Sequence, residues 1–309
     1  MTVSQARRGH GQQHPSLVAL LNECTAASDA EAAVRIRARE LVTQARELGW
    51  AGPPFDPVLL AEIRGIKVRP SSHELRQDAF VRRDEGGQVE IVWNQNRPTT
   101  RTRFSIGHEI THTFFPDCFV TVRNRECTAG SEESKDALER LCDVGAAELL
   151  MPLLEFTNDL RSLGVNMEAV DALRDRYQVS RQAACIRAVQ LTEHPCAAAF
   201  LSHRIKPTEE RRLAQGAFSF FDRPGPKLRV DFMVASRTFR GRTLPRHKSI
   251  PVGSRVSGLA KAPSSVDAAV EAVEEWPDVM TEPLRVVAAR VPGSRSDDVR
   301  VLALLKMGR

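Results

Sequence analysis

The residues best suited to chemistry lie together in the segment RFSIGHEITHTFF, residues 103–115. It contains an H-E-x-x-H motif at His108-Glu109-Ile110-Thr111-His112. On an α-helix, side chains four residues apart lie on one face, so the two histidines could bind one Zn²⁺. The glutamate would then lie beside the open coordination position and take a proton from a metal-bound water. Such short motifs also occur by chance, so the motif alone does not establish a zinc site.

This geometry requires a helix. Pro98 suits a first helical turn, and nothing between residues 99 and 115 breaks a helix. Ile106, Ile110 and Phe114 recur at four-residue steps, which provides an apolar face for burial. Pro116 would end the helix.

A third ligand must come from elsewhere. Residues 134–152, SKDALERLCDVGAAELLMP, have helical composition and end at a proline. Glu139 and Asp143 share one face, whereas Glu148 projects to the opposite side. One helix cannot bring all three carboxylates to one metal, so the choice among them is open at this point.

The segments RFSIGHEITH and ALERLCDVGAAELLMP together resemble the ImmA/IrrE family of zinc metallopeptidases, and the resemblance extends over about residues 30–190. The residues that fall on the family's zinc ligands are His108, His112 and Glu139. The resemblance also implies that Glu109 is the general base and that Asp143 orients a ligand histidine. Zinc is the expected metal, with manganese as an alternative, since both suit histidine and carboxylate ligands.

Three positions depart from the family pattern. Cys142 replaces the usual alanine, Gly145 replaces the usual phenylalanine, and Thr111 stands where a glycine or another small residue is commoner. None of them removes a ligand. We expect Gly145 to weaken the helix packing, and Asp143 and Glu148 remain alternative third ligands.

Composition restricts the class of protein. The chain has 309 residues, 42% of them hydrophobic, which allows two or three domains. It contains no apolar run close to the roughly 18 residues of a membrane span. The first residues lack the apolar core of a secretory signal, and the six cysteines form no C-x-x-C pair. We therefore expect a cytoplasmic chain with reduced thiols.

The chain divides into four predicted segments. These are a disordered leader at 1–15, a metallopeptidase domain at 16–160, a helical unit at 161–195 and a C-terminal α+β or β-rich domain at 196–309. The fold class is therefore α+β, with a mainly helical, zincin-like core. Within it, residues 16–49 read as helical, and strands at 66–69, 78–83 and 89–93 form a small sheet. In zinc peptidases a sheet edge can hold an extended peptide, and strand 89–93 is our candidate edge.

The helical unit at 161–195 resembles a helix-turn-helix whose second helix starts near Ser180. Arg181 and Arg187 would then suit DNA phosphates, although a packing hairpin is the simpler interpretation. In the C-terminal domain we expect several strands and a helix at 265–275. The family resemblance implies that this domain has a regulatory or sensory role.

Two further cysteines lie after the first histidine helix. Cys118 or Cys127 could occupy the open zinc position and stop activity, although ordinary buried or loop thiols are the simpler account. The net charge of +5 permits an acidic partner or nucleic acid, but a solvated basic surface explains it as well.

These observations predict a zinc-dependent metalloendopeptidase. The family resemblance implies a specific protein substrate, such as a DNA-binding repressor or an antitoxin, which is cleaved to control transcription in a stress response. The alternative is a DNA-binding transcriptional regulator with a structural or vestigial metal site. Direct nucleic-acid binding belongs to that alternative, and neither interpretation involves a membrane.

Overall fold

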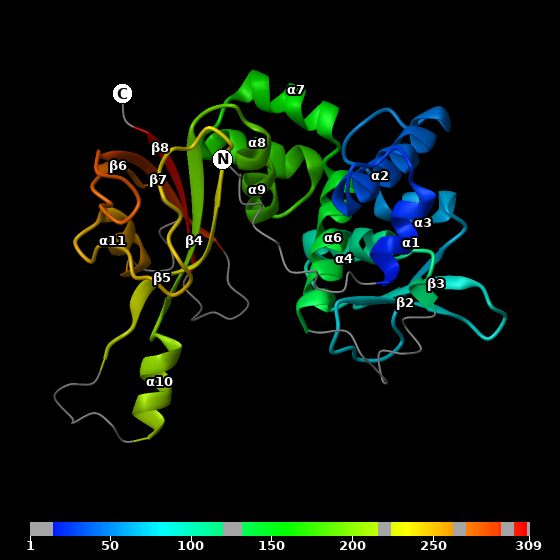
Figure 1. Ribbon diagram of the computed structural model, residues 1–309, viewed down its shortest axis with the longest axis horizontal. Coiled ribbons are helices and arrows are strands. Elements are labelled where there is room, and N and C mark those ends of the chain that lie inside the picture. The colour runs from blue at the N-terminus through cyan, green and yellow to red at the C-terminus, as the bar shows by residue number, and fades with distance from the viewer. Residues whose placement is uncertain (1–14, 120–131, 216–223, 262–269, 292–299, 308–309) are drawn as a thin grey trace, which may run out of the picture. The chain divides into compact units, whose positions relative to one another are not determined.

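The computed structural model describes residues 15–119, 132–215, 224–261, 270–291 and 300–307 (Figure 1). Its combination of helices with two sheets confirms the predicted α+β class. The predicted disordered leader lies outside the described residues, except that Pro15 starts the first helix. The chain forms two compact units, one of residues 1–152 with 177–179 and one of residues 153–176 with 180–309.

The first unit is mainly helical. Its elements are α1 (Pro15–Glu23), α2 (Ala30–Glu47), α3 (Pro57–Ile63), β1 (Lys67–Pro70), β2 (Ala79–Arg83), β3 (Val89–Trp93), α4 (Thr99–His112) and α6 (Glu132–Leu150). The segment predicted as one helical run at 16–49 is two helices. The reason is local, because the Asp29 carboxylate accepts a hydrogen bond from the Ala32 amide at 2.8 Å and caps a new helix there.

The small sheet has the strand order β1-β3-β2, with β1 parallel and β2 antiparallel to β3. Strand β3 is central, and Glu90, Ile91 and Val92 on it are buried. The candidate edge at 89–93 was therefore wrong, because both sides of that strand are already hydrogen-bonded. The outer strand β2 is the one that packs most closely against α4.

Helix α4 carries the H-E-x-x-H motif and packs against α6 and the small sheet. Its apolar stripe is buried as the periodicity predicts: Ile106 is 2% exposed, Ile110 0% and Phe114 4%. These side chains join one continuous core with residues of α2, α3, β2 and α6. The motif is thus carried by a helix whose opposite face is held in the core.

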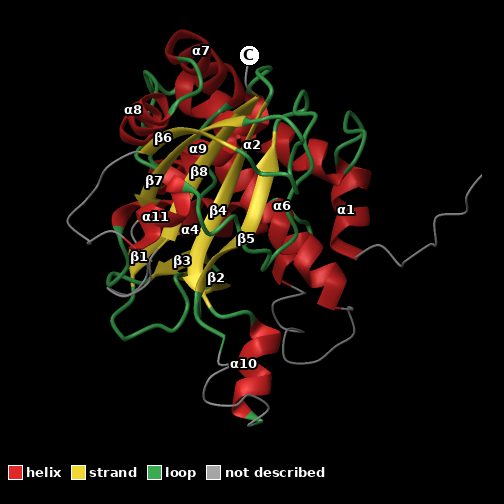
Figure 2. Ribbon diagram, turned by 90° about the vertical axis from the view of Figure 1, so that its left-hand side faces the viewer, coloured by secondary structure: helices red, strands yellow, loops and turns green. Residues whose placement is uncertain are grey.

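The second unit contains the remaining helices and a five-stranded sheet. Its elements are α7 (Leu153–Leu163), α8 (Met167–Tyr177), α9 (Arg181–Leu191), β4 (Cys196–Arg204), α10 (Pro207–Ala214), β5 (Lys227–Ala235), α11 (Arg255–Lys261), β6 (Val270–Glu274), β7 (Leu284–Val291) and β8 (Arg300–Met307). The sheet is antiparallel throughout, with the order β5-β4-β8-β7-β6 (Figure 2).

One feature of this unit differs from the expectation. The predicted helix at 265–275 is a strand from Val270 to Glu274, because this segment pairs with β7, and residues 265–269 lie outside the described part of the chain. Helix α9 contacts β4 and β5.

None of the helices in the described residues is long and apolar enough to cross a membrane.

Candidate metal centre

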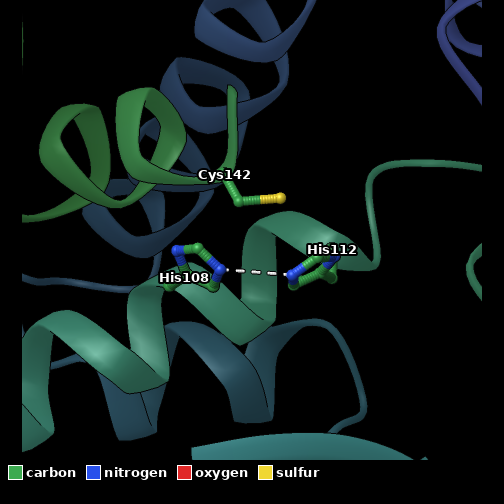
Figure 3. Close-up of side chains that lie close together, drawn as sticks. All are labelled: His108, His112 and Cys142. Atoms are coloured by element: carbon green, nitrogen blue, oxygen red, sulfur yellow. Dashed lines mark hydrogen bonds between the residues drawn. The ribbon is translucent and has the colours of Figure 1, made fainter. Parts of the chain in front are cut away.

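Helix α4 brings its two motif histidines together on one side. The Nε2 atoms of His108 and His112 lie 3.2 Å apart, as the dashed line in Figure 3 marks. The His112 side chain is 5% exposed and that of His108 17% exposed. Both side chains are therefore largely buried, and His108 is the more exposed of the two.

Helix α6 places a carboxylate against the same nitrogens. The Oε2 atom of Glu139 lies 3.1 Å from Nε2 of His108 and 3.8 Å from Nε2 of His112. Its side chain is half exposed. Two nitrogens of α4 and one oxygen of α6 thus face one point between the helices.

These distances can be compared with those around a metal. Tetrahedral zinc with bonds of about 2.0–2.1 Å to nitrogen and oxygen holds its ligand atoms about 3.3–3.4 Å apart. The separations of 3.2, 3.1 and 3.8 Å are close to this value. Two imidazoles and a carboxylate are also a common zinc donor set, so the residues present fit the ion. The ligand roles of His108, His112 and Glu139 themselves remain a prediction.

Asp143 lies one turn after Glu139 and binds the far side of the first histidine. Its Oδ1 is 2.9 Å from Nδ1 of His108. When Nδ1–H donates to this carboxylate, Nε2 is left unprotonated in the neutral ring and points at the shared site. Asp143 is therefore placed to orient His108, in agreement with the role that the resemblance implies.

The charges at the site alter the proton affinities of its members. Burial lowers the pKa of His108, but the hydrogen bonds to Asp143 and Glu139 and the nearby charge of Glu109 outweigh it, and the pKa is raised to about 9. Hydrogen bonds from His108 and then His112 hold the pKa of Glu139 well below its usual range. Without a metal, His108 is therefore protonated at neutral pH.

The predicted general base lies beside this group. Glu109 is buried, and its Oε2 accepts a hydrogen bond from the backbone amide of Val81 at 3.0 Å. Val81 belongs to β2, so the outer strand of the small sheet holds the carboxylate in place. Because the Val81 N–H points at Glu109 of α4, the side of β2 that is not paired with β3 faces this helix.

The structure brings one further side chain to the histidines. In the described part of the chain, one potential metal cluster is found, and it consists of His108, His112 and Cys142, whose ligand atoms all lie within 4.8 Å of one another. In the sequence, Cys142 stands out only as a departure from the family pattern. Its spacing of three residues from Glu139 was the available signal, because residues three apart share a helix face. Burial raises the pKa of this thiol well above its ordinary range.

Cys118 and Cys127 are the two cysteines that the sequence suggested as occupants of the open zinc position. Cys118 is 8% exposed and belongs to the core of the first unit, outside the cluster at the histidines. Cys127 lies outside the described residues.

The alternative third ligand Glu148 is engaged elsewhere. It is 0% exposed, and its carboxylate accepts hydrogen bonds from Arg35 at 3.0 Å and from Arg39 at 2.9 Å. Both arginines belong to α2. Glu148 thus points to the side of α6 opposite Glu139, as the helical periodicity predicts.

The helix-turn-helix interpretation assigned Arg181 and Arg187 to DNA phosphates, but the structure gives both side chains other surroundings. Arg187 is 1% exposed, so it has no access to a phosphate. Arg181 binds both carboxylate oxygens of Asp171, at 2.6 and 3.0 Å, and donates to the carbonyl of Arg290. Neither side chain forms the free basic surface that DNA backbone contacts need. The expectation that these two arginines suit phosphates was therefore wrong.

Comparisons with known proteins show that the chain is similar to metalloproteases. Residues 61–189 match the peptidase M78 family model, described as the IrrE N-terminal-like domain. A radiation response metalloprotease IrrE of Deinococcus radiodurans is 28% identical over 207 residues, which cover 67% of this chain and 61% of that protein. The protein of the same name from Deinococcus deserti is 29% identical over 165 residues, 53% of this chain and 56% of that protein. The chain thus spans about three fifths of the length of these relatives.

A solved structure shares the fold. It is described as a Mycobacterium tuberculosis transcriptional regulator and aligns with a TM-score of 0.54 at 13% identity. The alignment covers 93% of this chain and 91% of that one.

Proposed function

Because the domain at residues 61–189 belongs to the ImmA/IrrE family of metallopeptidases, we propose that this chain is a zinc-dependent endopeptidase. The observation that carries the proposal is the meeting of two imidazole nitrogens and one carboxylate oxygen at separations of 3.1–3.8 Å. In this proposal His108, His112 and Glu139 hold the metal. When bound there, Zn²⁺ polarises a carbonyl and makes water acidic enough to lose a proton near neutral pH.

The protein groups around the metal then have distinct tasks. Glu109 takes a proton from the attacking water and passes it to the leaving amine. The amide of Val81 keeps the carboxylate of Glu109 in position for both transfers, at 3.0 Å. Asp143 keeps the Nε2 atom of His108 directed at the metal through its contact with Nδ1.

We propose that the substrate binds as an extended peptide along the outer edge of β2. This edge is not paired with another strand among the described residues, and it faces α4. Residues alternate in direction along a strand, so Ala79 and Arg83 present backbone groups to the same side as Val81. An added strand there would bring its peptide bonds past Glu109, and backbone pairing would give affinity with little dependence on sequence.

The finer proposal is a specific regulatory protein as substrate, such as a repressor or an antitoxin, in the cytoplasm. It is supported by the family resemblance, and two relatives carry the name radiation response metalloprotease. The competing proposal, a DNA-binding regulator that uses the helices at 161–195, is weakened by the burial of Arg187 and the ion pair of Arg181.

Metal analysis tests the site. We expect about one zinc per purified wild-type chain and none in His112→Ala, as for a three-residue catalytic site. His73→Ala is the matched control, because His73 is exposed and distant in sequence from the motif. A wild-type chain that binds no zinc when the ion is supplied at neutral pH would overturn the proposal.

Cleavage is tested with a general-base variant. Glu109→Gln should keep its zinc but lose about 10²–10⁴-fold in rate. A cell extract treated with wild-type protein should contain new amino termini, detected by mass spectrometry, that are missing after treatment with Glu109→Gln. Equal patterns for both proteins would contradict an endopeptidase.

A further inference from the structure

Cys142 occupies an unusual place for a buried thiol. It is 0% exposed, and its sulfur lies within 4.8 Å of a ring nitrogen of both His108 and His112. Figure 3 shows its side chain extending from α6 over the space between the two imidazoles.

Helix α6 thus reaches the histidines with two potential ligands, one turn apart. Glu139 approaches from the solvent side with a half-exposed carboxylate, and Cys142 from the protein interior. The positions i and i+3 place both on the face of α6 that packs against α4. Together with the two imidazoles they make a set of two nitrogens, one oxygen and one sulfur. Thiolate is a strong zinc ligand, and zinc accepts sulfur, nitrogen and carboxylate oxygen as ligand atoms.

We propose that Cys142 is a fourth protein ligand of the metal, an inference that rests on the zinc site of the proposed function. Four protein ligands close a tetrahedral site, whereas a catalytic site keeps one position for water. The chain with Cys142 bound is therefore a resting form. The thiol releases its proton to solvent when the sulfur–metal bond forms, and it takes a proton back when that bond breaks. Activity requires this exchange, because a water needs the position that the sulfur holds.

Cobalt spectroscopy tests the inference without any substrate. Co²⁺ bound to thiolate absorbs in the near ultraviolet by charge transfer, whereas imidazole and carboxylate ligands leave only the weaker visible bands. We expect the charge-transfer band in the wild-type chain and its loss in Cys142→Ser. Cys118→Ser is the matched control, since Cys118 is also buried in the first unit, and it should keep the band.

X-ray absorption of the zinc-loaded wild-type chain gives a second, independent measurement. One sulfur at about 2.3 Å from zinc is expected, in addition to nitrogen and oxygen at about 2.0–2.2 Å. This measurement decides the question even if Cys142→Ser does not fold. Bound metal with no sulfur neighbour and no charge-transfer band would overturn the role of Cys142 and leave the peptidase site intact. A chain that binds neither zinc nor cobalt would overturn both.

Discussion

Thr111 of α4 fills the space in which a side chain at position 145 of α6 would lie. A Cβ atom built on Gly145 would come within 2.3 Å of Cγ2 and 2.4 Å of Oγ1 of Thr111. Thr111 is 0% exposed, and its hydroxyl donates to the carbonyl of Gly107 at 2.9 Å. Two of the three departures from the family pattern, Thr111 and Gly145, thus face each other. Gly145 does not loosen the packing as we expected, because the threonine occupies the volume.

Gly145→Ala should destabilise the chain by about 1–3 kcal/mol, since the added methyl overpacks a buried helix contact. The gain of about 1 kcal/mol from replacing a helical glycine offsets only part of this cost. Gly107→Ala is the matched control, because a Cβ there would lie 3.5 Å from Ala146, an ordinary contact. Chemical denaturation of the purified variants measures both effects, and equal stability of the two would contradict the steric account.

A double-mutant cycle isolates this pair. In a Thr111→Gly background the contact is absent, so Gly145→Ala should become neutral or stabilising by up to about 1 kcal/mol. Additive effects of the two changes would show that the cost of Gly145→Ala arises elsewhere.

Glu148→Gln should destabilise the chain by about 3 kcal/mol, because it leaves two arginines without their buried counter-charge. We place the cost at the low end of the usual range, since Arg35 and Arg39 are 25% and 45% exposed and can turn to solvent. The control is Glu31→Gln, which removes an exposed partner of Arg35 and should change stability by less than about 0.5 kcal/mol. Zinc content should stay at the wild-type level in both variants. Loss of zinc in Glu148→Gln alone would restore Glu148 as a ligand.

Asp143→Asn should weaken zinc binding about 10–100-fold while leaving the fold intact, because it removes the carboxylate that orients His108. Competition with a chromophoric chelator measures the affinity. Asp136→Asn provides the comparison, since Asp136 lies on the same helix and is exposed. A zinc affinity equal to that of Asp136→Asn would show that Asp143 does not orient His108 for metal binding.

The stability of the metal-free chain should fall as the pH rises from about 6.5 to 9. The pKa of His108 in the folded chain is raised from 6.5 to about 9, so the protonated ring stabilises the fold below this window and the contribution is lost through it. Calorimetry in the presence of a chelator should show a steeper decline in Tm for the wild-type chain than for His108→Gln, which lacks the titrating group. Parallel profiles would show that His108 does not titrate in this range. Zinc affinity should rise over the same window, because zinc and the proton compete for the ring.

Features that depend on short spacings follow from the sequence alone. A four-residue interval puts two histidines on one helix face, and the apolar stripe that buries the opposite face follows the same period. The same periodicity predicted that Glu139 and Glu148 lie on different sides of their helix. In the structure Glu148 forms ion pairs with Arg35 and Arg39. Strand β3 was also predicted at its observed bounds, 89–93, because alternation and turn residues mark it locally.

Tertiary structure decided what depends on how these elements meet. The strand order placed β3 inside the small sheet and left the outer side of β2 facing α4, and no local pattern distinguishes a central strand from an outer one of similar composition. The crossing of α4 and α6 brought Cys142 to the histidines and Thr111 to Gly145, because contact across two helices depends on their rotation and offset as well as on sequence spacing. Arg187 is buried, because the packing of α9 against β4 and β5 determines which face of that helix remains in water.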